Sequence, residues 1–188
     1  DLETITYSDG TAWYKIAATV AQLSSVTGTI YDGDASILTL TGSGFLTSNL
    51  VVNFEQSSDS IDQDVTVTPS SDTSATVTVP AAVYNNVTAG NVVSVSVTNS
   101  EGMRSTAISK TAVGLPSGGT ITTSGSYRIH TFTSSSSLVV PSGLSLTDVE
   151  YLVIAGGGGG GGAQNIYGGG GGGAGGYRSS VTGESSGG

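Results

Sequence analysis

Acidic residues between Glu55 and Asp64 are the first candidates for chemistry in this chain. Asp59, Asp62 and Asp64 lie within six residues of one another, and Glu55 lies just upstream. Carboxylate oxygens at such short spacing can bind a hard cation such as Ca²⁺. The run lacks the central glycine and the distal glutamate of an EF-hand loop. We therefore expect an acidic surface turn and no metal site, with calcium binding at Asp59, Asp62 and Asp64 as the alternative.

The chain has few side chains of the kinds that enzymes use for catalysis, and we expect that it is not an enzyme. It has no Cys and one His, His130, which alternates with Arg128 and Phe132 in a strand-like pattern. No G-x-S-x-G sequence places a serine on a strand-to-helix turn. A glycosidase needs a pair of carboxylates in a cleft, whereas the acids here lie mostly in expected turns. Glycine runs match G-x-G-x-x-G, but no βαβ unit follows them, so we expect no catalytic residue and no cofactor.

Side chains around the glycine-rich segment are the candidates for contacting a receptor. They are Asn165, Tyr167, Tyr177 and Arg178. Exposed Tyr and Arg side chains often dominate the energy of binding. The alternative is that these side chains are buried as plugs between glycine segments.

Charge and hydropathy exclude two classes of partner. Five Lys and Arg residues against fourteen Asp and Glu residues give a net charge of −9. Nucleic-acid binding requires clustered basic residues, so we expect no nucleic-acid partner. No apolar run approaches the roughly 18 residues of a membrane helix, so we expect no membrane insertion.

Alternation of apolar and polar residues predicts an all-β fold. Val93, Val95 and Val97 recur with Ser between them, as on a strand with one buried face. Six strands are expected, at residues 36–41, 50–55, 64–68, 75–79, 92–98 and 104–112. Six or seven short strands in about 90 residues favour a β-sandwich.

Composition divides the chain into three expected regions. Residues 1–23 form a short hairpin and oligomerisation segment, with a tight turn at Asp9-Gly10. Trp13 and Tyr14 are adjacent and point to opposite faces, so one of them is expected to meet a neighbouring domain or subunit. Residues 24–114 form the sandwich. Residues 115–188 form a glycine-rich β domain that looks truncated.

Half of the thirty glycines lie in one tract. Residues 156–176 contain 15 Gly among 21 residues. Glycine loses the most backbone entropy on ordering, so a polyglycine run becomes ordered only when other backbone packs closely against it. We expect ordered, extended segments, with a flexible linker as the alternative.

The middle region resembles the IPT/TIG family of immunoglobulin-like domains. The resemblance rests on the G-x-G-F turn in residues 38–45, the V-x-V-P strand end in residues 75–80, and the V-x-V-x-N-x-x-G hairpin in residues 93–102. Membership would imply an immunoglobulin-like sandwich that acts as a spacer or interaction module.

The last region resembles the glycine-rich domains of bacteriophage tail fibres and related virion adhesins. Residues 149–155 run into polyglycine, and Ala174-Gly175-Gly176-Tyr177-Arg178 closes it. The resemblance implies a structural protein of the virion, extracellular, located in a tail or fibre and presenting its glycine-rich region for attachment to the host.

The expected partners follow from this resemblance. They are other virion proteins, further copies of the chain, with a trimer favoured, and a host-surface glycan or protein. One alternative is a virion decoration or an extracellular filament subunit without a receptor role. Another is a bacterial surface adhesin or a carbohydrate-binding module.

Overall fold

The structure is a computed structural model that describes residues 5–11, 13–16, 18–162 and 168–184. These residues form thirteen strands and one four-residue helix, so the expectation of an all-β fold is confirmed. Contacts divide the chain into two compact units, residues 1–144 and 145–188.

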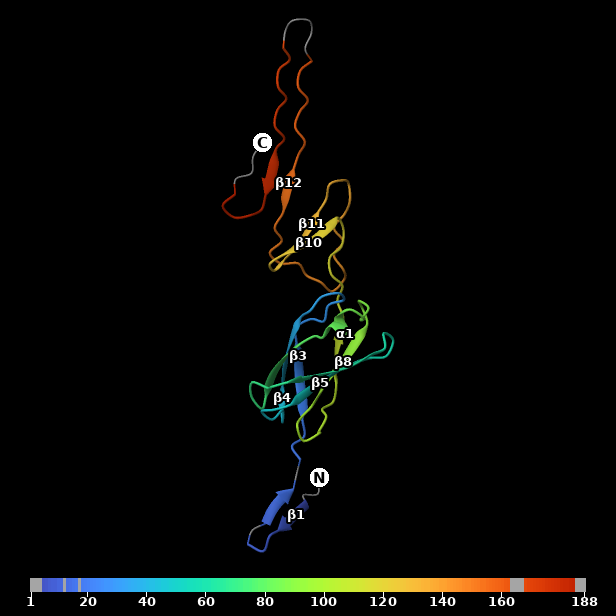
Figure 1. Ribbon diagram of the computed structural model, residues 1–188, viewed down its shortest axis with the longest axis vertical. Coiled ribbons are helices and arrows are strands. Elements are labelled where there is room, and N and C mark those ends of the chain that lie inside the picture. Colours follow the sequence, from blue (N-terminus) through green and yellow to red (C-terminus); the bar gives the residue numbers. More distant parts are fainter. Residues whose placement is uncertain (1–4, 12, 17, 163–167, 185–188) are drawn as a thin grey trace. The chain divides into compact units, whose positions relative to one another are not determined.

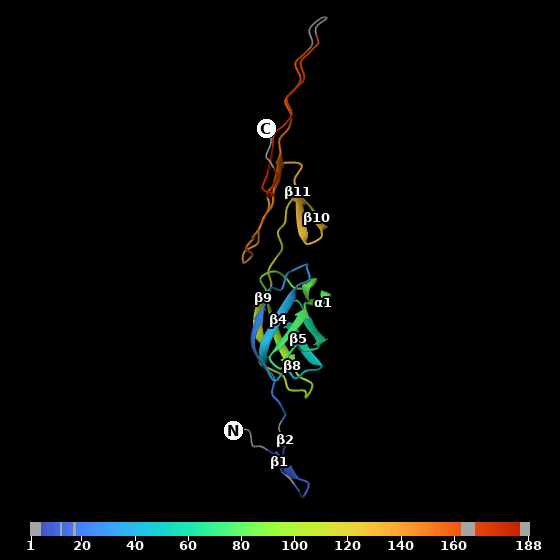
Figure 2. The ribbon, with the colours of Figure 1, turned by 90° about the vertical axis from the view of Figure 1, so that its left-hand side faces the viewer.

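Two antiparallel sheets make up what we call the two-sheet body, residues 21–113 of the first unit (Figure 1 and Figure 2). One sheet has the order β3-β4-β7, and the other has the order β6-β5-β8-β9. Their strands are β3 (Gln22–Thr27), β4 (Ile37–Ser43), β5 (Leu50–Gln56), β6 (Ile61–Val67), β7 (Ser74–Thr78), β8 (Val92–Thr98) and β9 (Ile108–Thr111). The helix α1 (Ala81–Tyr84) follows Pro80 and buries Val83.

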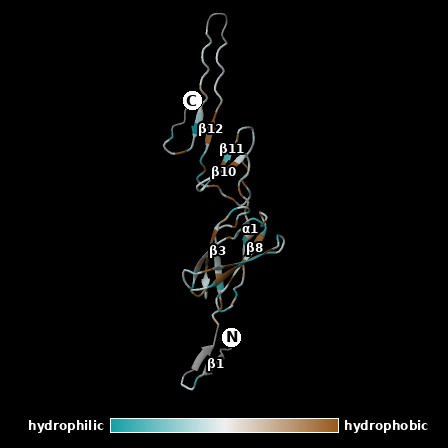
Figure 3. Ribbon diagram, in the orientation of Figure 1, coloured by the Kyte–Doolittle hydropathy of each residue, from teal (hydrophilic) through white to brown (hydrophobic). Residues whose placement is uncertain are grey.

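One hydrophobic core lies between these sheets. Twenty buried hydrophobic residues, all between Ala21 and Ala112, contribute to it. Val52 lies opposite Val97, and Phe54 lies opposite Val95, with all four side chains fully buried. Buried and exposed residues alternate along β4 and β7, and Figure 3 shows hydrophobic and hydrophilic residues mixed in the strands of the body. In β4 and β7 the period-two pattern therefore places one face of the strand in the core.

The expected strands agree with the observed ones to different degrees. Strand β8 has the expected bounds, and β4, β5 and β7 differ by at most two residues. Strand β6 begins three residues earlier than expected, at Ile61. Strand β9 begins at Ile108, four residues later than expected. Before β9, regular backbone pairing with β8 is interrupted at Ser105. The Ser105 hydroxyl accepts a hydrogen bond from the Val97 amide, and the Ser105 amide donates to the Val97 carbonyl.

Strand β3 was not expected, and it crosses the boundary that composition placed between residues 23 and 24. Its apolar residues, Leu23 and Val26, are three positions apart, which breaks the period of two. A register shift between Leu23 and Ser25 explains this spacing. The extra residue of the bulge turns both apolar side chains toward the core. The body therefore begins before residue 24.

The first segment is a hairpin, as expected. Strand β1 (Ile5–Ser8) pairs antiparallel with β2 (Trp13–Ile16). Gly10 adopts φ of 94°, and the Thr11 amide donates to the Asp9 carboxylate at 2.8 Å. The side chains of Trp13 and Tyr14 lie outside the described part of the structure.

A second hairpin follows the two-sheet body. Strand β10 (Thr120–Ser124) pairs with β11 (Tyr127–Thr131). Ser117 and Val139 exchange two backbone hydrogen bonds that fix the entry to this hairpin. No residue from 119 to 140 is buried.

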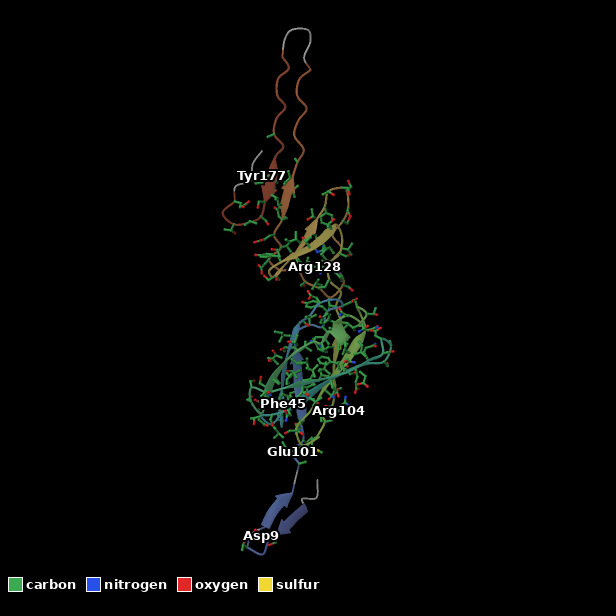
Figure 4. All side chains as sticks on the ribbon, in the orientation of Figure 1. Asp9, Phe45, Glu101, Arg104, Arg128 and Tyr177 are labelled. Atoms are coloured by element: carbon green, nitrogen blue, oxygen red, sulfur yellow. The ribbon has the colours of Figure 1, made fainter. Side chains whose placement is uncertain are left out.

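The second unit contains a third hairpin. Strand β12 (Leu152–Ile154) pairs with β13 (Tyr177–Ser179). Between these strands run two glycine-rich segments, residues 155–162 and 168–176, which we call the glycine arms. Figure 4 shows the arms as nearly bare backbone, in contrast to the body, where side chains are crowded.

Candidate functional site

Asp59 holds two loops of the body together. Its carboxylate accepts hydrogen bonds from the Thr88 amide (2.9 Å), the Thr88 hydroxyl (3.1 Å) and the Asn91 side-chain amide (2.9 Å). These donors lower the pKa of Asp59, with the Asn91 bond as the largest cause and the Thr88 backbone bond next. Both carboxylate oxygens therefore act as acceptors in a loop contact.

Asp62 and Asp64 lie apart from that contact, on the outer face of the β6-β5-β8-β9 sheet. Asp64 accepts a hydrogen bond from the Asn53 side-chain amide at 2.6 Å. Asn53 in turn accepts from the Thr98 hydroxyl at 3.0 Å. The structure thus separates Asp59 from the other two calcium candidates. Among the described residues, no group of three His, Cys, Asp or Glu residues is arranged to hold a metal ion.

Arg104 balances the acidic part of this outer face. Glu55 and Asp62 lie directly opposite each other on β5 and β6. Like charges in that position destabilise a sheet. The Arg104 guanidinium bonds Glu55 at 2.6 Å and the Ser96 hydroxyl at 2.9 Å. These contacts hold the outer face of the sheet together.

His130 is held by backbone. It lies on β11 opposite Ile121, and its Nδ1 donates to the Gly118 carbonyl at 2.8 Å. The other ring nitrogen, Nε2, is shielded from solvent and has no hydrogen-bond partner. The imidazole therefore fixes the turn at Gly118, where φ is 113°.

A pocket near the end of the body is lined by no titratable side chain. It is lined by Ala89, Gly90, Thr111, Ala112, Val113, Gly114, Pro141, Ser142 and Gly143. None of these residues can act as a general acid, a general base or a charged ligand.

The receptor-contact candidates are divided by the structure. Asn165 and Tyr167 lie outside the described residues. Tyr177 and Arg178 begin β13, where they pair with Ile154 and Val153. Adjacent strand residues point to opposite faces, so Tyr177 and Arg178 do not share one surface.

The glycine arms are joined by hydrogen bonds with a period of three residues. The amides of Ala155, Gly158 and Gly161 donate to the carbonyls of Gly176, Gly173 and Gly170 at 2.8–2.9 Å. An antiparallel β ladder repeats every two residues, whereas a polyproline II helix has three residues per turn. The arms therefore leave β geometry beyond β12 and β13 but keep the same register.

Close approach of backbone explains why one side of each arm is glycine. A Cβ at Gly172 would overlap the carbonyl of Gly158, and a Cβ at Gly175 would overlap that of Ala155. A Cβ at Gly171 would meet no atom within 4 Å. Ala174 lies three residues further on, one repeat of the hydrogen-bond period, and carries a side chain. None of the described glycines in the arms has a positive φ. Glycine is required here for contact, not for an unusual dihedral angle.

Burial separates the body from everything that follows it. Among the described residues, eighteen large hydrophobic side chains are exposed, and fifteen of them lie after residue 120. No residue from 145 to 184 that the structure describes is buried. The hairpins and arms consequently present apolar side chains and unpaired backbone to their surroundings. These exposed edges are the candidate interaction site.

The sequence did not predict that the Asn99 side chain joins several loops of the body. Asn99 is 3% exposed, and its side chain makes four hydrogen bonds, to Thr19, Gly44, Glu101 and Met103. The signal available was the Asn-x-x-Gly turn at residues 99–102. Such a turn indicates a local bend but not the distant loops that Asn99 joins.

Comparisons with known proteins give no relative. No family model, no curated protein and no solved structure matches the chain. Across the part of the chain that the structure describes, no helix has the length and apolar character needed to cross a bilayer.

Proposed function

We propose that the chain is a non-enzymatic structural protein of a bacteriophage virion, part of a tail fibre or adhesin. In this proposal the two-sheet body is a spacer of the immunoglobulin-like class, and the glycine-rich region serves attachment to the host surface. The protein acts as a homo-oligomer, with a trimer favoured, and its location is extracellular, on the particle.

One observation carries the proposal: hydrophobic burial stops at Ala112 while the chain continues with strands and apolar residues. An isolated two-stranded hairpin is marginally stable in water. A self-sufficient body followed by hairpins without a core suits a subunit that completes its structure in an assembly. An enzyme, in contrast, needs its titratable groups gathered in a cleft.

Strand order supports the immunoglobulin-like part of the proposal. Immunoglobulin folds pack a sheet containing strands A, B and E against a sheet containing G, F and C. The orders β3-β4-β7 and β6-β5-β8-β9 can be matched to A-B-E and C′-C-F-G.

Labelling of particles tests the location. Antibody raised against the full chain is expected to label the tails of phage particles that carry its gene. Symmetric labelling of the head or the tail tube would favour a decoration role. Absence of the chain from purified particles would overturn the proposal of a virion protein.

Binding to intact host cells tests the attachment role, and the sequence offers a matched control. Tyr177 and Arg178 begin β13, just as Tyr127 and Arg128 begin β11. Alanine at Tyr177 and Arg178 is expected to weaken binding about tenfold or more, whereas alanine at Tyr127 and Arg128 leaves it unchanged. Equal loss in both double variants, or no binding by the wild-type chain, would contradict attachment through the glycine-rich region.

A further inference from the structure

The second unit has apolar side chains on both faces of its hairpin. Ile154 is 73% exposed and Leu152 is 60% exposed on one face of β12, and Val153 is 59% exposed on the other. Opposite them on β13 lie Tyr177, Ser179 and Arg178. A second layer packed on either face would bury the residues of that face, which the hairpin alone cannot do.

Each glycine arm uses part of its hydrogen-bonding capacity. Every third amide of the first arm, beginning at Ala155, donates to the second arm. With three residues per turn, successive amides point about 120° apart, so the remaining two thirds point away from the partner arm. Across the described residues of the arms, no other backbone hydrogen bond joins 155–162 to 168–176. These groups form open edges that a further chain can pair with.

The pattern of free space shows which sides of the arms are open. A Cβ at Gly156, Gly159, Gly170 or Gly173 would meet no atom within 4 Å. Glycine is nevertheless present at all four positions, although nothing within the unit excludes a side chain there. Ala174, in contrast, shows that a side chain is accepted on the side of the arm that Ala174 and Gly171 share, three residues apart.

The chemistry of an open edge restricts its partner. The partner must be a backbone without side chains on the contacting face, because a Cβ would hold the two chains apart. It must also present donors and acceptors at a three-residue period. The arms of this chain meet both requirements. They contain no charged residue, so copies of a chain with net charge −9 repel each other least along this segment.

We propose that the glycine arms of one copy pack edge to edge against the arms of a second copy, along the sides marked by Gly156, Gly159, Gly170 and Gly173. Because β12 and β13 continue into the arms in the same register, the same contact brings the exposed hairpins of the two copies next to each other. The inference rests on the homo-oligomeric part of the proposed function and identifies the surface through which copies associate.

The test compares the self-association of three full-length proteins by sedimentation equilibrium. They are the wild type, an edge variant carrying Gly159→Ala and Gly173→Ala, and a control carrying Gly171→Ala. All three substitutions place a methyl group in space that is open within one copy. The wild type and the control are expected to associate equally, and the edge variant about tenfold or more weakly, because its backbone groups lose their partners.

Hydrogen exchange on the wild type gives a readout that does not depend on any variant. The amides of Gly156 and Gly159 are expected to become protected as concentration rises, while Gly158 and Gly161 are protected throughout. Exchange at Gly156 and Gly159 that does not change with concentration would overturn the proposed contact.

The outcomes separate this inference from the proposed function. An edge variant that associates like the wild type would place the interface elsewhere and leave a homo-oligomer intact. A wild-type chain that stays monomeric would overturn both the contact and the homo-oligomer. Association through the arms without binding to particles or cells would preserve the contact and contradict the attachment role.

Discussion

Asn99 holds Thr19 in place across 80 residues of chain: its side-chain amide donates to the Thr19 carbonyl at 2.6 Å. The same amide donates to the Gly44 carbonyl at 2.9 Å, and the Asn99 side-chain oxygen accepts from the amides of Glu101 and Met103. The Thr19 amide also donates to the Glu101 carboxylate. One buried side chain therefore joins the entry to the body, the loop after β4 and the turn after β8.

Replacing Asn99 is expected to destabilise the body strongly. Asn99→Ala removes the partner of two carbonyls and two amides. Three of these four bonds are only part-buried, so water replaces some of them, and each group that stays unsatisfied costs about 1–3 kcal/mol. We expect a loss of about 2–4 kcal/mol in the free energy of unfolding, measured by urea denaturation. Asn86→Ala, which removes one exposed hydrogen bond to the Ala82 carbonyl, is the matched control and should change stability by less than about 1 kcal/mol. Equal effects would contradict the central role of Asn99.

Asp59 is expected to make the stability of the body depend on pH in the acidic range. Its pKa is lowered in the folded protein by the hydrogen bonds from Asn91 and Thr88. A depressed pKa contributes stability that is fully present above the unfolded value of about 3.9 and is lost as pH falls through the folded value. Asp59→Asn should therefore lower the Tm at pH 7 and reduce the difference in Tm between pH 7 and acid. A variant whose Tm falls with acid as steeply as that of the wild type would exclude Asp59 as a contributor.

Two neighbouring residues on β5, Phe54 and Glu55, are expected to differ widely in their contribution to the free energy of unfolding. Phe54 is fully buried, and Phe54→Ala should cost about 3–5 kcal/mol of unfolding free energy. Glu55 is about half exposed and pairs with Arg104, so Glu55→Gln should cost less than about 1 kcal/mol. Chemical denaturation of both variants checks the contrast, and similar losses would show that the strand does not alternate between core and solvent.

Residues 18–114 are expected to fold without the rest of the chain. All twenty buried hydrophobic residues in the described part of the chain lie within this fragment. Its Tm should match that of the body in the full-length protein, as followed by circular dichroism and by the dispersion of amide signals in NMR spectra. An unfolded fragment would mean that later segments contribute to the core.

Pairing of the glycine arms is expected to fail when a methyl group is placed between them. Gly175→Ala sets a Cβ against the carbonyl of Ala155, whereas Gly171→Ala points into open space. Loss of the ladder should speed hydrogen exchange at Gly158 and Gly161 about tenfold or more in the first variant. The second variant should exchange like the wild type. Unchanged exchange in Gly175→Ala would contradict the observed pairing of the arms.

Strand content could be read from the sequence where burial is regular. Val93, Val95 and Val97 alternate without interruption, and β8 has the bounds that this alternation predicts. Leu23 and Val26 do not alternate, because the bulge in β3 inserts a residue that pairing with β4 alone explains. Ser105 ends regular pairing through a side-chain hydrogen bond to Val97 that leaves no mark on hydropathy.

The candidate site was predicted in part. Polyglycine between two strand-like segments indicated close backbone packing, since an ordered glycine run needs backbone contact. The sequence contains no sign of the three-residue period, because fifteen identical glycines do not show which positions repeat. Gly172 and Gly175 differ from Gly171 solely in what the opposite arm places beside them.

Composition and alternation by themselves determined an all-β protein of low charge with one dense glycine tract. These properties follow from local rules: β-branched residues suit strands, and the face of each strand follows from counting by two. The tertiary structure decided that Asp59 joins loops apart from Asp62 and Asp64, and that the core ends at Ala112. It also decided which glycines touch another backbone. Those outcomes depend on residues that meet across the chain, 14 positions apart for Gly158 and Gly172 and 32 for Asp59 and Asn91, and local patterns carry no information about such distant partners.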